Sequence, residues 1–104
     1  MDVAPILAEI RAGLEQLYGP RLKGVYLYGS YARGEADPES DLDILVVLDD
    51  FEQYGREVNL TGELISDLSL KHALTISCVF LRQKEWLYGD TPFLVNAREE
   101  AIPS

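Results

Sequence analysis

The segment from Tyr28 to Leu48 is the feature that most limits how this chain can fold. It starts at the end of a β-prone run, turns at Gly29-Ser30, and enters a nearly continuous apolar run that opens with Asp41 and Asp43. Apolar residues at almost every position are typical of a central strand that is covered on both faces. We therefore expect two strands joined by this turn, in a sheet against which helices pack.

The rest of the chain supplies the helices and one more strand. Apolar spacing and turn residues predict helices over residues 2–18, 52–71 and 91–101, and strands over residues 22–28, 42–48 and 73–81. The expected fold is α/β or α+β, a small mixed sheet flanked by helices, in a single domain over residues 1–104. Gly55 and Gly62 each weaken the middle helix by ~1 kcal/mol relative to alanine, so we expect it to be broken or mobile near them.

Charge and cysteine content limit the partners and the compartment. The 104 residues carry a net charge of -9, which opposes a phosphate backbone. Stable binding to nucleic acid is therefore not expected, and a basic protein partner is favoured. The single cysteine, Cys78, excludes an internal disulfide, and no run approaches the ~18 apolar residues of a membrane helix. We expect a cytoplasmic protein without a membrane segment.

Asp41 and Asp43 form the first part of a candidate site. Residues two apart in a strand point to the same face, so the two carboxylates lie on one side with α-carbons ~6.5 Å apart. Magnesium prefers oxygen ligands and is usually held by one or two carboxylates together with substrate phosphates. An isolated pair of this kind would be interpreted as a polar strand entry. This pair, however, follows Gly29-Ser30 after ten intervening residues.

Gly29-Ser30 forms the second part of the site. Glycine allows a phosphate to approach the backbone, Ser30 adds a hydroxyl, and the amides of the helical turn that follows direct positive charge at an anion. A plain strand-to-helix turn accounts for Gly29 but only partly for Ser30, so the nearby acids favour phosphate binding. Arg33, one helical turn later, is placed to reach the same phosphate, although a solvated arginine explains it equally well.

Two competing motifs are excluded in this segment. Gly29 and Gly34 have the glycine spacing of a P-loop, but Glu35-Ala36 follows where lysine and then serine or threonine are required. A calcium loop of the EF-hand type that began at Asp37 would need glycine where Leu42 stands. The segment therefore needs another interpretation.

Gly29-Ser30, ten residues, and then Asp41-x-Asp43 resembles the signature of the minimal nucleotidyltransferases of the DNA polymerase β superfamily. The expected order of elements resembles that fold over essentially the whole chain. The resemblance implies Mg²⁺-dependent transfer of a nucleoside monophosphate, AMP from ATP or another nucleoside triphosphate, to a hydroxyl. It also implies that Asp41 and Asp43 are catalytic and hold two Mg²⁺ ions, and that Gly29 and Ser30 bind the triphosphate. Arg33 is a further candidate for that phosphate, on its spacing from Ser30 alone.

The chain departs from this family at one position of the site. Active members generally add a third carboxylate from a later strand, and residues 74–80 contain no acid. Ser77 or Thr75 stands in the corresponding place, and neither hydroxyl replaces a carboxylate as a base near neutral pH. Glu63 and Asp67 on the preceding helix are conceivable substitutes, but solvated helix positions explain them better.

Three functions follow from these patterns. The first is an enzyme that modifies a hydroxyl of a partner protein, because relatives of this type commonly pair with a helical HEPN toxin and act as its antitoxin. The second is a catalytically weak or inactive module that neutralises a partner by binding alone, which the missing third acid favours. Transfer to an antibiotic or another small molecule is least favoured in a chain without a substrate domain. The nucleotide base, the acceptor and the formation of an oligomer stay open at this point.

Overall fold

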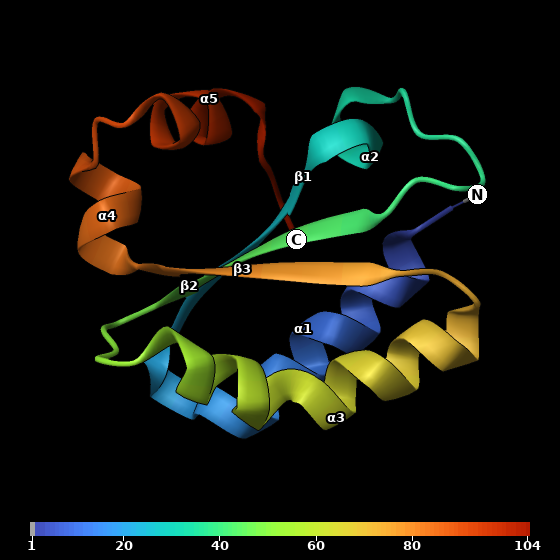
Figure 1. The fold of residues 1–104 in the computed structure, drawn as a ribbon, viewed down its shortest axis with the longest axis horizontal. Helices are drawn as coiled ribbons and strands as arrows, with labels where there is room; N and C mark the ends of the chain where they lie inside the picture. Colours follow the sequence, from blue (N-terminus) through green and yellow to red (C-terminus); the bar gives the residue numbers. More distant parts are fainter. Residues whose placement is uncertain (1) are drawn as a thin grey trace.

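A computed structural model describes residues 2–104 of the chain (Figure 1). Its helices are α1 (Ala4–Tyr18), a 3-10 turn (Gly19–Arg21), α2 (Gly29–Arg33), α3 (Tyr54–His72), α4 (Gln83–Tyr88) and α5 (Pro92–Glu100). Its strands are β1 (Leu22–Tyr28), β2 (Leu42–Leu48), β3 (Ile76–Arg82) and β4 (Ile102–Pro103). No helix among these residues is long and apolar enough to cross a membrane.

The four strands form one mixed sheet in the order β3-β2-β1-β4. β1 pairs with β2 and with β4 in antiparallel fashion, whereas β2 and β3 run parallel. A parallel pair needs a long crossover, and α3 provides it. The mixed sheet flanked by helices is the fold that the sequence predicts.

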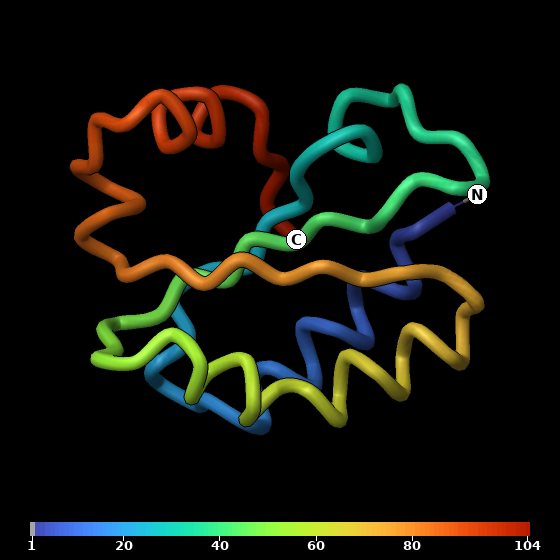
Figure 2. The backbone as a smooth tube through the Cα atoms, viewed as in Figure 1, coloured from blue at the N-terminus to red at the C-terminus, as the bar shows by residue number. Residues whose placement is uncertain are grey.

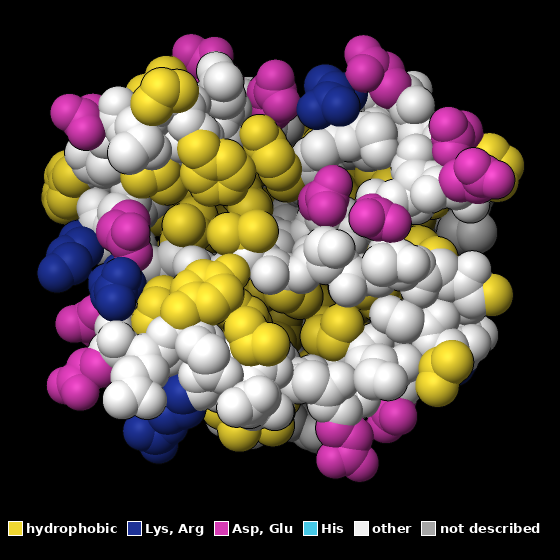
Figure 3. Space-filling view, in the orientation of Figure 1, with side chains coloured by type: hydrophobic (Ala, Val, Ile, Leu, Met, Phe, Trp, Pro, Cys, Tyr) yellow, Lys and Arg dark blue, Asp and Glu magenta, His cyan; other side chains and the backbone are white. Residues whose placement is uncertain are grey.

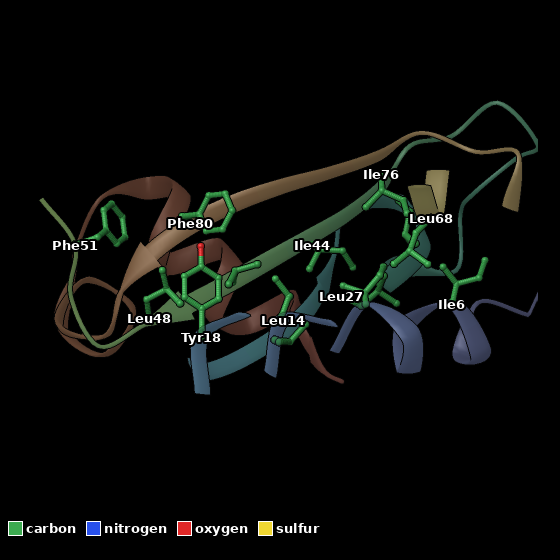
Figure 4. Close-up of a cluster of buried hydrophobic side chains, with 14 residues drawn as sticks. Ile6, Leu14, Tyr18, Leu27, Ile44, Leu48, Phe51, Leu68, Ile76 and Phe80 are labelled. Carbon is green, nitrogen blue, oxygen red and sulfur yellow. The ribbon is translucent and has the colours of Figure 1, made fainter. Parts of the chain in front are cut away.

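One face of the sheet carries the main hydrophobic core. α1 and α3 lie side by side against this face (Figure 1), and Figure 4 shows side chains from both helices pointing into the strands. Ile10 and Leu14 of α1 are completely buried, as their spacing along the helix predicts. The buried members of this core are Ile6, Ile10, Leu14, Tyr18, Val25, Leu27, Leu42, Ile44, Val46, Leu48, Phe51, Leu68, Ile76 and Phe80.

The other face of the sheet is covered only in part. A second, smaller cluster joins Val47 and Leu81 of the sheet to Leu94 of α5, with Trp86 of α4 packed against it. The chain trace in Figure 2 shows α2 and α5 rising on this side, with the last residues running back between them. Asp43 lies at the start of β2, next to α2, and its side chain is half-buried. This end of the sheet is therefore partly accessible.

Three predicted elements differ from the structure. α3 is continuous through Gly55 and Gly62, so the predicted break there is wrong. Its inner face buries side chains against the core, and such packing contributes more to the stability of a helix than the propensity that two glycines remove. β3 begins at Ile76 rather than residue 73, because Leu74 still donates its amide to the Ser69 carbonyl at the end of α3.

The C-terminal region also departs from expectation. α5 starts as predicted, with the Thr91 hydroxyl accepting the Leu94 amide, but it ends at Glu100 and Pro103 lies in β4. Proline is tolerated there because β4 is an edge strand. The sequence analysis does not predict α4 or β4, since both are too short to show a periodic pattern.

A buried polar pair joins α1 to α3. The Tyr18 hydroxyl donates to Oε1 of Glu57 at 3.1 Å, and Glu57 is only 3% exposed. Burial, followed by the hydrogen bond to Glu57, raises the pKa of Tyr18 well above its ordinary value, so the donor stays protonated. The pair gives the buried carboxyl of Glu57 a hydrogen-bond donor, and Nη1 of Arg21 lies 4.0 Å from the same oxygen.

Tyr18→Phe is expected to lower the free energy of unfolding by about 1–3 kcal/mol, because the buried carboxyl of Glu57 loses its donor. Urea denaturation at pH 7 measures the change. Tyr88→Phe is the matched control, because it removes the same hydroxyl from a side chain that is 81% exposed. Its effect should stay below ~0.5 kcal/mol. Equal effects of the two substitutions would contradict the role given to the Tyr18–Glu57 hydrogen bond.

Candidate active site

Asp43 lies in a row of three side chains across the accessible end of the sheet. It is paired with Tyr28 of β1 on one side and with Ser77 of β3 on the other. Paired residues of neighbouring strands point to the same face, so the three side chains lie together. Their neighbours Ile44 and Ile76 point to the opposite face and belong to the main core.

Gly29 brings the start of α2 against Asp43. Its φ of 72° lies in the left-handed region that favours glycine, and a β-carbon on it would overlap Oδ2 of the Asp43 carboxylate. Ser30 follows directly, and no side chain caps the first amides of α2. Gly29 and Asp43, one residue from each part of the predicted site, are therefore in contact, and the uncapped amides at the start of α2 lie beside them.

The negative charge of Asp41 affects the pKa of Asp43. Asp43 is half-buried and Asp41, which directly precedes β2, is exposed. Burial, and then repulsion by Asp41, raises the pKa of Asp43, while the positive charge of Arg33 acts in the opposite direction. Two repelling carboxylates at one accessible position are a donor set that suits a divalent cation, and Mg²⁺ at such a site takes its remaining ligands from phosphate and water.

Arg33 lies near the acids but is already paired. Its Nε is 3.1 Å from Oε2 of Glu35, and its Nη1 is 3.6 Å from Oε2 of Glu100 at the end of α5. Glu35 is the main cause of the raised pKa of Arg33. The sequence analysis does not predict the contact with Glu100, because it depends on how α5 packs against α2.

Of Ser77 and Thr75, the two residues that the family resemblance offers for the place of a third carboxylate, Ser77 lies directly beside Asp43. Among residues 2–104 no group of three or more acids, histidines or cysteines is arranged to hold a metal ion. Glu63 and Asp67 do not fill the gap, since α3 packs on the opposite face through Leu68. Their interpretation as solvated positions is confirmed, because both side chains are exposed.

An aromatic pair that the sequence analysis does not assign to the site lies next to Asp43. The rings of Tyr28 and Phe93 meet edge to face, with centroids 5.7 Å apart. Alternation along residues 22–28 places Tyr28 on the accessible face, but only the pairing of β1 with β2 places it opposite Asp43. Phe93 reaches this position through the packing of α5, for which the sequence carries no local signal.

Gly29→Ala is expected to destabilise the fold more than Gly34→Ala, although both glycines have a φ of 72°. The left-handed backbone costs each alanine ~1–2 kcal/mol. At Gly29 the new methyl group also displaces the Asp43 carboxylate, which adds ~1–3 kcal/mol, whereas at Gly34 it meets open space. Urea denaturation of both variants measures the difference. Equal losses would show that Gly29 and Asp43 are not in close contact.

Comparison with known proteins identifies the family of this chain. A family model described as a nucleotidyltransferase domain matches residues 7–103. The chain is 30% identical to "Putative protein adenylyltransferase MJ0141" of Methanocaldococcus jannaschii, over 80% of this chain and 83% of that protein.

Solved structures share the fold. One described as a "putative minimal nucleotidyltransferase" is 28% identical, with a TM-score of 0.62 over 100% of this chain and 97% of that one. Another is a complex of tri-AMPylated Shewanella oneidensis HEPN toxin with MNT antitoxin, 19% identical with a TM-score of 0.53 over 93% of this chain and 70% of that one. The match over residues 7–103 and the identity to the archaeal relative agree with the geometry of the site: this chain belongs to the nucleotidyltransferase domain family.

Proposed function

We propose that this nucleotidyltransferase transfers AMP from ATP to a hydroxyl group of a helical HEPN-type partner protein, with Mg²⁺, and acts as the antitoxin of that partner. The observation that carries the proposal is the contact of Gly29, at the start of the Gly29-Ser30 turn, with the Asp43 carboxylate. Phosphate-binding backbone and metal-binding oxygens at one place are the parts that phosphoryl transfer requires.

In this proposal each residue has a defined task. The backbone at Gly29 and the hydroxyl and amide of Ser30 bind the triphosphate, with Arg33 contributing charge when it releases its acidic neighbours. Asp41 and Asp43 would hold Mg²⁺, which neutralises phosphate charge and stabilises the attacking and leaving oxygens. The acceptor oxygen bonds to the α-phosphorus while the bond from that phosphorus to the bridging oxygen breaks, and pyrophosphate leaves.

Within residues 2–104, no third carboxylate lies beside Asp43 to accept the proton of the acceptor hydroxyl. Ser77 is the group beside Asp43, and its hydroxyl does not accept a proton near neutral pH. The proton is therefore released to water or to a group that the acceptor protein brings. The lack of a third carboxylate beside Asp43 also favours the second candidate function, neutralisation of the partner by binding alone.

Charge and the comparisons support a protein as the partner. A chain with a net charge of -9 attracts a basic surface and repels polyanions. The archaeal relative is named a protein adenylyltransferase, and the Shewanella complex joins an antitoxin of the same fold to an AMPylated HEPN toxin. An AMP-transferring antitoxin accounts for all of these features together.

Asp41→Asn with Asp43→Asn is expected to abolish AMP transfer while leaving the protein folded, because the amides keep the shape but lose the charge that holds Mg²⁺. The assay follows labelled ATP into a candidate HEPN-type partner. Glu39→Gln is the matched control, because it removes an exposed carboxylate from the loop before β2 and should keep full activity. Equal labelling by the parent and the double variant would refute the site, and failure of the parent to label a cognate partner would support binding alone.

Ser77→Asp is expected to raise the rate of AMP transfer by roughly 10²-fold, the lower end of what a positioned general base contributes. The new carboxylate would face Asp43 from the paired position on β3. Ser77→Asn provides the comparison of equal size without a base and should stay near the parental rate. Single-turnover labelling with saturating ATP separates this effect on chemistry from an effect on binding. A rate for Ser77→Asp no higher than that for Ser77→Asn would contradict the role assigned to this position.

A further inference from the structure

Aromatic side chains lie on one side of the proposed nucleotide site, and a small polar side chain lies on the other. Tyr28 borders Asp43 on the β1 side, with Phe93 beyond it, whereas Ser77 borders Asp43 on the β3 side. Figure 3 shows hydrophobic side chains gathered over the part of this face between α4, α5 and β3, with acidic side chains next to them. The two sides therefore suit different chemical groups.

The two aromatic rings lie next to the predicted metal ligands. Directly paired residues have β-carbons about 4.5–5.5 Å apart, so the Tyr28 side chain starts beside Asp43. The Phe93 ring meets the Tyr28 ring with centroids 5.7 Å apart, at an interplanar angle of 74°. One ribose separates the base of a nucleotide from its α-phosphate, so a phosphate at Asp41 and Asp43 leaves the base free to extend toward these rings.

The Phe93 side chain is not part of the buried core. It belongs to neither buried cluster within residues 2–104, and its neighbour Leu94 fills the space against Val47 and Leu81. The Phe93 side chain is 40% exposed, although the ordered start of α5 holds its backbone, where the Thr91 hydroxyl accepts the Leu94 amide at 3.3 Å. An exposed aromatic ring on a fixed backbone next to a phosphate site is a stacking surface for a flat ring.

We propose that Phe93, supported edge-on by Tyr28, stacks against the nucleobase of the bound nucleoside triphosphate. The inference rests on the proposed function and assigns the base to the β1 side of Asp43. It leaves the β3 side, at Ser77, for the acceptor hydroxyl. Recognition by stacking accepts any base and favours the larger surface of a purine, so Phe93 contributes affinity rather than the choice of one base.

The test compares Phe93→Ala with Val95→Ala by isothermal titration with Mg²⁺-ATP and with Mg²⁺-tripolyphosphate. Val95 is the matched control, because it lies on the same helix and is also 40% exposed. Phe93→Ala is expected to weaken ATP binding roughly tenfold or more, the usual effect of removing one stacking ring. Tripolyphosphate has no base, so its affinity should change less than twofold. Val95→Ala should leave both affinities within twofold of the parent, and Phe93→Tyr should restore ATP binding.

The outcomes separate this inference from the proposed function. If the parent binds ATP and the Asp41→Asn/Asp43→Asn variant does not, but Phe93→Ala binds ATP like the parent, the stacking role is wrong and the active site stands. If Phe93→Ala weakens ATP and tripolyphosphate equally, Phe93 acts by supporting the fold, and the inference is again overturned. If the parent binds neither ligand, the proposed function fails, and the stacking role fails with it.

Discussion

The pairing of β1 with β2 is the constraint on which the rest of the site depends. Tyr28 lies opposite Asp43, and the next residue along the chain, Gly29, turns back over the carboxylate. Side chains alternate along a strand, so a shift of one residue in this register would move Asp43 into the hydrophobic core. Two buried pairs lie on the same ladder: Leu27–Ile44 is directly next to the Tyr28–Asp43 pair, and Val25–Val46 is three positions from it. Core packing and the position of Asp43 are therefore set by the same strand pairing.

One face of the sheet carries the packing that stabilises the fold, and the other face carries the candidate active site. α1 and α3 pack against one face and bury most of its apolar side chains, which holds the strands in a fixed arrangement. On the other face, α4 and α5 cover the end of the sheet near Val47 and leave the row at Asp43 accessible to a ligand. The candidate site residues thus lie on a sheet that is supported from its opposite face.

Local patterns in the sequence predict the parts of the fold that are set locally. β1 and β2 lie at the predicted residues, because alternation and a long apolar run describe them directly. β4 exists only because β1 offers an edge to Ile102 and Pro103, so no local pattern reveals it. The spacing of Gly29-Ser30 and Asp41-x-Asp43 indicates which residues to group, yet the positions of Phe93 and Glu100 require the packing of α5. The sequence therefore predicts the residues proposed to bind phosphate and metal, but it does not predict the aromatic residue Phe93 beside them.

The raised pKa of Asp43 links the site to the stability of the whole domain. Because the folded state holds a proton on this carboxyl more tightly than the unfolded chain does, the group favours folding at low pH. That contribution is lost as the pH rises through the raised pKa, so at neutral pH the charged site opposes folding. A cation that binds between Asp41 and Asp43 reverses this opposition, since a ligand of the folded state alone stabilises that state by mass action. Under the proposed function, a bound metal would therefore contribute to the stability of the fold as well as to the reaction.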